Sequence, residues 1–112
     1  MKKIEAIVRP SKLEPLKEAL HKVHIKGISI SELHGCGNQH GWKEYYRGSE
    51  VMVNTLPKIK FEIVTTDDRV DELVKIIAET ARTGEVGDGK IFIIPVEEVI
   101  RIRTGEQGEA AL

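Results

Sequence analysis

Apolar and polar residues alternate over residues 2–9, as they do in a β-strand that buries one face. Pro10 ends this strand because it has no backbone N–H to donate to a sheet. The next four residues, Ser-Lys-Leu-Glu at 11–14, have the pattern of a helix capping box. Helical spacing then follows at Leu13, Leu16, Leu20 and Val23. We therefore predict a strand, a helix with Pro15 in its first turn, and a second strand over 25–33, where β-branched residues alternate with serines.

The second half of the chain repeats this plan. Residues 58–64 (KIKFEIV) echo residues 2–8 (KKIEAIV), and Asp67-Asp68 then suits the positive end of a helix. The apolar stripe of this helix is formed by Val70, Leu73, Val74, Ile77 and Ala81. A strand over 90–96 and a shorter alternating segment over 99–103 follow. The order βαβ–βαβ predicts a ferredoxin-like α+β fold, a four-stranded antiparallel sheet with two helices on one face.

The other face of this sheet has no predicted helix. By alternation, Lys58, Lys60, Glu62 and Val64 lie on it, opposite apolar residues at 59, 61 and 63. With Ile7 added, this face exposes more aliphatic surface than water favours. We therefore expect copies of the chain to pack against one another through the sheet.

Length and composition limit the kind of protein. At 112 residues, 40% apolar and 31% charged, the sequence fits one globular domain and excludes disorder. The net charge of −1 disfavours a nucleic-acid binder, and aromatic residues, at 4%, are too few for a sheet that stacks RNA bases. The single cysteine, Cys36, excludes an internal disulfide. With no apolar run long enough for a membrane span or a signal peptide, we expect a cytoplasmic protein.

The longest connection between the predicted elements, residues 35–56, has no clear periodicity. Loops of more than about 12–15 residues are uncommon in compact domains and are usually functional or disordered. This one contains Trp42, Tyr45, Tyr46 and Arg47, residue types that dominate binding hot spots. We expect a partner-binding loop; the alternative is that Trp and Tyr pack against the domain as a small core.

A glycine-rich segment follows the second predicted helix. Residues 84–90 fit G-x-x-x-x-G-K, the start of a Walker A pattern, but Ile91 stands where Mg²⁺ needs a Ser or Thr. The segment also leads into a strand and not into the helix whose N-terminus receives phosphate, so a conventional P-loop is excluded. Its glycines and Lys90 still offer N–H groups and a cation to phosphate. The alternative is a glycine-rich turn that only introduces a strand.

Two arginines near the C-terminus bear on this choice. Arg101 and Arg103 are two positions apart, so a strand would direct both guanidinium groups to the same side. Guanidinium groups bind phosphate oxygens through paired hydrogen bonds, and with Lys90 they favour a polyphosphate site. The alternative is a sheet edge guarded by charge. The histidines offer no comparable site, because His21 and His24 share a helix face but no third metal ligand is identifiable.

Five motifs give the chain a resemblance to a known family. They are MKKIEAI (1–7), YRGSE (46–50), LPK (56–58), TG with GDGKIF (83–92) and IRIRTGE (100–106). On these motifs, the chain resembles the nitrogen-regulatory PII signal-transduction proteins from end to end. The HGCG motif at 34–37 resembles the sequence of the ammonium-channel-associated branch of this family. The resemblance implies one PII-like domain over 1–112, with a flexible partner-binding loop at about 37–55, a glycine loop at 82–90 and a C-terminal segment at 102–112.

The resemblance also implies a homotrimer whose sheets line its centre, with ATP or ADP in clefts between subunits. The nucleotide would contact Ser29, Gly35, Cys36, Gly37, Asn38, Glu62, Val64, Gly87, Asp88, Gly89, Lys90, Arg101 and Arg103. 2-Oxoglutarate would share Mg²⁺ with ATP beside Gln39, with Gly87 nearby and Lys58 pairing a carboxylate. The implied activity is signalling and not catalysis. The loop would regulate an ammonium channel, a nitrogen-metabolism enzyme or a transcription regulator. The protein would be associated with a membrane only through a channel partner.

Some positions depart from the family pattern or bear on modification. Val51 stands where many relatives have a tyrosine that is uridylylated, so uridylylation there is excluded. Ser49 matches a serine that is phosphorylated in some relatives. Asn38 replaces a commonly basic residue and removes one phosphate contact, while His40 lies beside Gln39 in the implied 2-oxoglutarate site.

A second class of function stays open, because a fold alone names no function. Nucleoside-diphosphate kinases and acylphosphatases also use ferredoxin-like sheets, so the alternative is a small phosphotransferase or phosphatase. A kinase of that kind needs a histidine that accepts the phosphoryl group, and His34 is the candidate.

Overall fold

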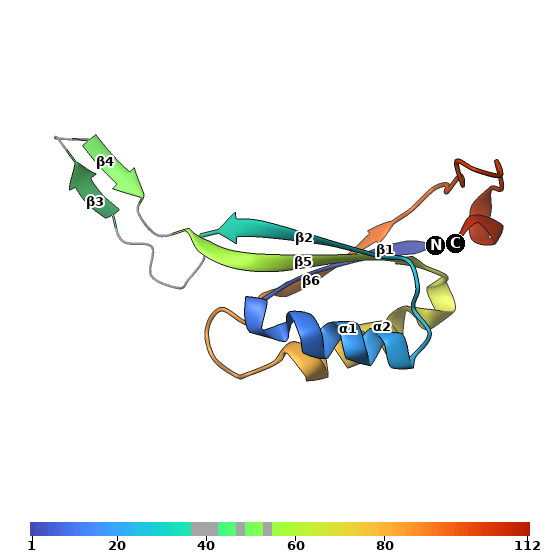
Figure 1. Cartoon of the computed structure of the whole chain (residues 1–112), viewed down its shortest axis with the longest axis horizontal. Coiled ribbons are helices and arrows are strands. Elements are labelled where there is room, and N and C mark those ends of the chain that lie inside the picture. The colour runs from blue at the N-terminus through green and yellow to red at the C-terminus, as the bar shows by residue number, and fades with distance from the viewer. Residues whose placement is uncertain (37–42, 47–48, 53–54) are drawn as a thin grey trace.

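The computed structural model describes residues 1–36, 43–46, 49–52 and 55–112. Four strands form its main sheet in the order β2-β5-β1-β6, and each neighbouring pair is antiparallel. Their bounds are Lys2–Val8 (β1), Ile28–Gly35 (β2), Leu56–Thr65 (β5) and Lys90–Pro95 (β6). Helices α1 (Leu13–Lys22) and α2 (Val70–Ala81) cover one face of this sheet (Figure 1). The predicted ferredoxin-like α+β fold is confirmed.

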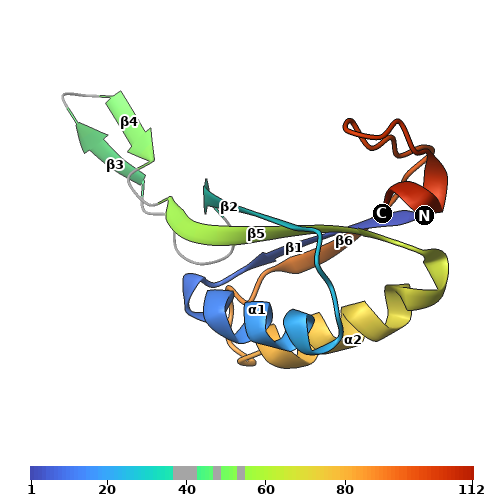
Figure 2. The same ribbon diagram turned by 45° about the vertical axis from the view of Figure 1, so that its right-hand side comes forward.

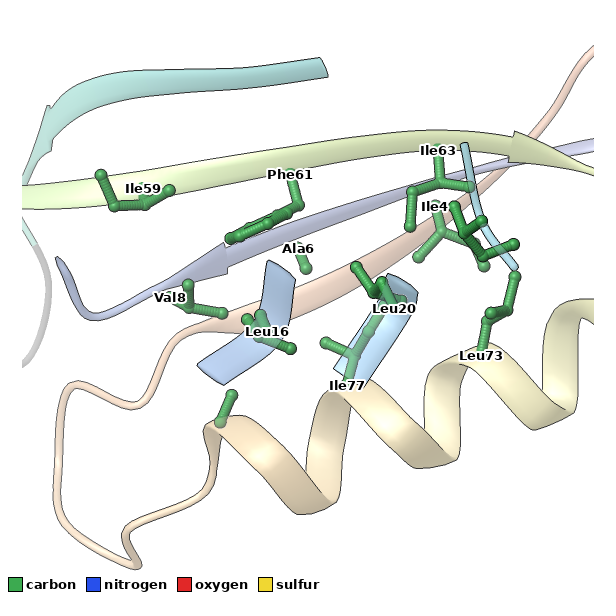
Figure 3. Close-up of a cluster of buried hydrophobic side chains, with 12 residues drawn as sticks. Ile4, Ala6, Val8, Leu16, Leu20, Ile59, Phe61, Ile63, Leu73 and Ile77 are labelled. Carbon is green, nitrogen blue, oxygen red and sulfur yellow. The ribbon is translucent and has the colours of Figure 1, made fainter. Parts of the chain in front are cut away.

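The core lies between the sheet and the two helices (Figure 3). Buried residues of β1 and β5 alternate with half-exposed ones, as a period of two predicts. Leu16 and Leu20 of α1 meet Leu73 and Ile77 of α2 there, each at most 1% exposed. Removing such a side chain from water contributes roughly 1.5–3 kcal/mol. Phe61 is the one aromatic residue in this described cluster, so the core is aliphatic, as the composition indicates.

The second predicted strand begins later than residue 25. β2 starts at Ile28, whereas Ile25 lies just before it and is buried in the core. An apolar residue of a connecting segment cannot be told from part of a strand by periodicity alone. β5 begins earlier than its predicted start at residue 58, at Leu56.

Two short strands, β3 (Lys43–Tyr46) and β4 (Ser49–Met52), pair as a separate antiparallel hairpin. The hairpin extends beyond the end of the sheet where β2 finishes and β5 begins (Figures 1 and 2). The sequence predicts a loop without periodicity over 35–56. This prediction is wrong for residues 43–46 and 49–52, which form strands. Their residues give little apolar–polar contrast between faces, so alternation does not reveal them.

The alternating segment over 99–103 does not form a strand. The chain turns there instead, and the N–H of Gly105 donates to the carbonyl of Arg101 at 2.8 Å. Gly105 has φ +73°, a conformation that favours glycine and ends the short alternation. An isolated bridge between Ile100 and Gln107 closes the turn. Short 3₁₀ segments occur at Pro10–Lys12, Asp67–Arg69 (η2) and Gly108–Ala111.

The face of the sheet away from the helices carries the predicted polar alternation. Lys3 contacts Glu5 at 3.0 Å and Glu62 at 2.9 Å, and Lys60 contacts Glu62 at 3.2 Å. Phe92 pairs with Glu5 in the sheet register, so it lies on this same face, and it is 44% exposed. We call the face that bears these residues the open sheet face.

Candidate functional site

A cavity of about 530 Å³ lies where the glycine loop, residues 82–90, meets the main sheet. Its walls come from β1, β2, β5 and β6 as well as from the loop. The lining residues are Ile7, Leu33, Gly35, Cys36, Lys58, Glu85, Val86, Gly87, Asp88, Gly89, Lys90 and Phe92. This volume is in the range of small-molecule binding sites. We call it the glycine-loop cavity.

The loop passes too close to β1 to allow a side chain at its last glycine. A Cβ on Gly89 would lie 1.7 Å from the carbonyl oxygen of Ile7. Gly89 also has φ +99°, a conformation that favours glycine. The glycine therefore brings the loop backbone against the sheet, immediately before Lys90 begins β6.

The carboxylate of Asp88 holds the loop together from within. It accepts hydrogen bonds from the backbone N–H groups of Thr83 at 2.8 Å and Gly84 at 2.9 Å, and from the Thr83 hydroxyl. Arg9 Nε donates to the same carboxylate at 3.1 Å. These donors, led by the Thr83 hydroxyl, hold the pKa of Asp88 well below its ordinary value. Asp88 is therefore ionised at neutral pH.

Two lysines bring positive charge to the cavity. Lys58 Nζ donates to the carbonyl of Gly87 at 2.7 Å, so it contacts the loop directly. Partial burial, and then the nearby charge of Arg9, lower the pKa of Lys58 from its ordinary value of 10.5. Lys90 is exposed at the start of β6. Ammonium groups beside a glycine-rich backbone suit an anionic ligand.

The structure brings together part of the predicted ligand site. The predicted residues that line the cavity are Gly35, Cys36, Lys58, Gly87, Asp88, Gly89 and Lys90. Ser29 and Glu62 lie opposite each other in β2 and β5, outside that lining. Val64 is two positions further along β5 on the same face and is half-buried. These three residues lie along the open sheet face, beyond the cavity.

The segment after β6, which contains Arg101 and Arg103, lies at the opposite end of the molecule from the glycine loop (Figure 2). Arg101 Nη1 donates to Glu106 Oε1 at 2.8 Å, and its Nη2 donates to the carbonyl of Leu112 at 3.1 Å. Arg103 is exposed in the turn. The prediction that a strand aims both arginines the same way is wrong, because there is no strand. Neither arginine is among the described residues that line the cavity of this chain.

Several predicted residues lie outside the described ranges: Gly37, Asn38, Gln39, His40, Trp42 and Arg47. Of the remaining residues of the predicted partner-binding loop, Tyr45 and Tyr46 belong to β3, and Ser49 and Val51 belong to β4. The structure therefore places the backbone of these four residues in the hairpin.

His34 has no role in the cavity. It pairs with Pro57 in the register and is exposed, whereas its neighbour Leu33 lines the cavity. Successive side chains of a strand point to opposite faces, so the phosphoryl-acceptor role is not supported. Within the described ranges, no group of three His, Cys, Asp or Glu residues is arranged to hold a metal ion. None of the helices there is long and apolar enough to cross a membrane.

Arg9 is the main site residue that sequence motifs miss. Its Nη2 donates to the carbonyl of Val86 at 2.7 Å, in addition to its contact with Asp88. One signal could have revealed it: Ile7 pairs with Lys90 in the register, so the residue two positions after Ile7 passes beside the loop that precedes Lys90. That signal needs the strand pairing, which no short motif contains.

Comparison with known proteins finds relatives over the whole chain. A family model described as "Nitrogen regulatory protein P-II" matches residues 1–106. "Nitrogen regulatory protein P-II" of Azospirillum brasilense is 55% identical over 112 residues, which cover 100% of both chains. "Nitrogen regulatory protein P-II 1" of Escherichia coli K12 is 54% identical over the same full length. A solved structure of Arabidopsis thaliana PII bound to citrate matches with a TM-score of 0.81 and 42% identity, covering 99% of this chain and 91% of that one.

Proposed function

The chain belongs to the nitrogen regulatory protein P-II family, and on that premise we propose that it is a signalling protein without a catalysed reaction of its own. Its ligands in this proposal are ATP or ADP, and 2-oxoglutarate with Mg²⁺, bound between subunits of a homotrimer. The partner-binding segment at about 37–55 then regulates an ammonium channel, a nitrogen-metabolism enzyme or a transcription regulator. The names of the relatives support a regulatory role.

The observation that carries this proposal is the glycine-loop cavity. Its loop offers backbone N–H groups of the kind that cradle phosphates, and Lys58 and Lys90 add positive charge beside them. In the proposal, the phosphates contact Gly87, Gly89 and Lys90. The adenine and ribose lie against Ser29, Gly35, Cys36, Glu62 and Val64, along the open sheet face.

A neighbouring subunit supplies the remaining cations in this proposal. Because the C-terminal segment that contains Arg101 and Arg103 lies far from the glycine loop of its own chain, a site that uses both features needs two copies (Figure 2). The open sheet face supports such an assembly, since Phe92 on it is 44% exposed and gains by burial against another copy.

Lys58 is the proposed partner of a 2-oxoglutarate carboxylate. Lys58 lines the cavity, and its ammonium group donates to the carbonyl of Gly87 in the glycine loop. The Arabidopsis thaliana relative was solved with citrate, a polycarboxylate, which supports a carboxylate ligand. Mg²⁺ prefers oxygen ligands and uses few protein contacts when it bridges phosphates. Gln39 would supply the protein oxygen, and ATP and 2-oxoglutarate the others.

In the proposal, the β3–β4 hairpin region is the part of the protein that binds the regulated partner. Trp42, Tyr45, Tyr46 and Arg47 are residue types found in interface hot spots. In the proposal, Arg47 enters a channel pore or an acidic pocket of the partner, and Ser49 is a site for phosphorylation. A ligand shifts this region only through its different affinities for two shapes.

Titration calorimetry with ATP tests the nucleotide site. We expect Lys90→Ala and Arg103→Ala each to weaken binding about tenfold or more, the typical effect of losing a charged hydrogen bond. Lys75→Ala is the control, because Lys75 is exposed on α2. Unchanged affinity in both test variants contradicts the assignment. 2-Oxoglutarate, titrated in the presence of Mg²⁺ and ATP, should bind the wild type and fail to bind Lys58→Met.

A further inference from the structure

Arg9 makes two hydrogen bonds to the glycine loop from outside the cavity. Nε donates to Asp88 Oδ1 at 3.1 Å and Nη2 donates to the carbonyl of Val86 at 2.7 Å. The Arg9 side chain is 24% exposed, and it is not among the described residues that line the cavity. A guanidinium group makes both contacts at once because its N–H groups form a rigid fork.

The carboxylate of Asp88 already accepts hydrogen bonds from other groups of the chain. Oδ2 accepts from the N–H groups of Thr83 and Gly84, while Oδ1 accepts from the Thr83 hydroxyl and from Arg9. Four donors use most of the acceptor capacity of a carboxylate. A carboxylate would also repel a phosphate, so the side chain of Asp88 is unsuited to direct contact with a nucleotide.

Building on the nucleotide site of the proposed function, we propose that Arg9 and Asp88 are positioning residues that fix the glycine loop in its phosphate-binding shape. Neither side chain contacts the nucleotide. Arg9 holds the end of the loop at Val86 and Asp88, and Asp88 transmits the constraint to Thr83 and Gly84, where the loop begins. We call this pair the loop clamp.

The loop clamp matters because glycines are costly to order. A glycine-rich segment has more conformational freedom to lose than any other, and ordering it during binding would reduce the affinity for the ligand. With the clamp in place, the loop is ordered before the nucleotide arrives. Lys58, which donates to the carbonyl of Gly87, holds the same part of the loop from the side of the sheet.

Asp88→Asn distinguishes a clamp from a simple effect of charge. If Asp88 acted only through its charge, neutralising it would strengthen the binding of an anionic nucleotide. If Asp88 holds the loop, the same change weakens binding. An amide nitrogen in place of Oδ2 cannot accept hydrogen bonds from the N–H groups of Thr83 and Gly84. The two explanations therefore differ in sign.

Calorimetry with ATP on the full chain measures whether each substitution weakens or strengthens ATP binding. We expect Asp88→Asn and Arg9→Met to weaken ATP binding about tenfold or more, as the loss of a charged hydrogen bond does. Arg9→Lys should show an intermediate loss, because it keeps the charge but not the fork. Unchanged or stronger binding by Asp88→Asn overturns the proposal, and so does wild-type affinity in Arg9→Lys.

Arg69→Met is a matched control for Arg9→Met. Arg69 Nη2 donates to the carbonyl of Val23 at 2.8 Å and its Nε contacts Glu72 at 3.4 Å, so it also joins a backbone carbonyl to a carboxylate. It lies in η2, at the other end of the helical layer from the glycine loop (Figure 1). We expect Arg69→Met to lower the melting temperature and leave ATP affinity unchanged. An equal loss of affinity in both variants would assign the effect to general destabilisation and overturn the proposal.

Amide hydrogen exchange in the ligand-free protein tests the loop clamp without relying on nucleotide binding. NMR should show faster exchange at Thr83 and Gly84 in Asp88→Asn and in Arg9→Met, with the amides of β1 still protected. Unchanged exchange at these two residues overturns the clamp. Absence of ATP binding by the wild type would instead refute the proposed function, and the exchange result would still decide whether the clamp exists.

Discussion

Gly89 brings the backbone of the glycine loop so close to β1 that a prediction follows for a substitution there. A methyl group there would lie 1.7 Å from the Ile7 oxygen, at φ +99°. Gly84 has a similar φ of +89°, but an added Cβ would meet nothing within 4 Å. We expect Gly84→Ala to lower the free energy of unfolding by about 1–2 kcal/mol from strain alone. Gly89→Ala should lower the free energy of unfolding clearly more than Gly84→Ala does, as measured by urea denaturation. Equal decreases in the two variants would contradict the close approach of Gly89 to β1.

Arg101 gives a second residue-level prediction, because the guanidinium group proposed to bind phosphate already holds an ion pair within the chain. Glu106 accepts from it at 2.8 Å, so the nucleotide must compete with this carboxylate. We expect Glu106→Gln to tighten ATP binding by roughly threefold, in line with the modest strength of an exposed ion pair. Glu109→Gln, a neutralised exposed acid of the same segment, should have a smaller effect in the same calorimetric titration. Weaker binding by Glu106→Gln would mean that Glu106 orients Arg101 for the ligand.

Residue chemistry predicted one part of the site and missed another. Lys90 and the glycines of the loop could be singled out because a cation and bare N–H groups suit phosphate wherever they occur, whereas the role of Lys58 came from the family resemblance. The structure places Lys58, Lys90, Gly87 and Gly89 at one cavity. Arg9 could not be singled out, because its role depends on which strand lies next to β1 and in which register. That information belongs to the tertiary fold and not to any short motif.

For elements, prediction succeeded where one face is buried. The alternation in β1 and β5 and the helical stripes of α1 and α2 reflect burial against a single core, so pattern and structure agree. The segment 99–103 alternates too, but no core faces it, and Gly105 turns the chain there. The β3–β4 hairpin has no apolar face that contrasts with a polar one. Periodicity is therefore informative only where burial imposes it.

The ion pairs of Glu62, with Lys3 of β1 and Lys60 of β5, predict how stability depends on pH. Hydrogen bonds from Lys3 and then Lys60 lower the pKa of Glu62 below its ordinary value of 4.5. A carboxyl group with a lowered pKa stabilises the fold above its unfolded pKa and loses that contribution as pH falls through the folded one. We expect the wild type to be more stable than Glu62→Gln at neutral pH.

That difference should shrink as the pH falls from the ordinary pKa of 4.5 through the lower pKa of folded Glu62, because the carboxyl group is then protonated in the folded chain as well as in the unfolded one. Urea denaturation at a series of pH values, at one protein concentration, measures it. Glu79→Gln, a change at an exposed position of α2, is the control and should show no comparable trend. A wild-type advantage that persists undiminished in acid would show that Glu62 acts through packing and not through charge.

For the molecule as a whole, a single chain leaves the open sheet face uncovered and the proposed nucleotide site without its arginines. The open sheet face leaves Phe92 exposed, and the C-terminal segment that contains Arg101 and Arg103 lies at the opposite end of the molecule from the glycine loop (Figure 2). Alternation in the sequence predicted the first feature, because it assigns each side chain to a face. The second follows from the direction of β6, which begins at the end of the glycine loop and carries the chain away from it before Arg101 and Arg103 are reached.

Mixing two binding-deficient variants tests whether the site is shared between subunits. A Lys90→Ala subunit keeps its arginines, and an Arg103→Ala subunit keeps its glycine loop. In a cyclic trimer that contains both kinds, one interface always joins an intact loop to an intact arginine. We expect co-refolded mixtures to regain tight ATP binding at that interface, whereas each variant alone binds weakly. If loop and arginine acted within one chain, no mixture would recover. The double variant Lys90→Ala with Arg103→Ala, refolded with the Lys90→Ala variant, is the control, because no interface in that mixture has an intact loop.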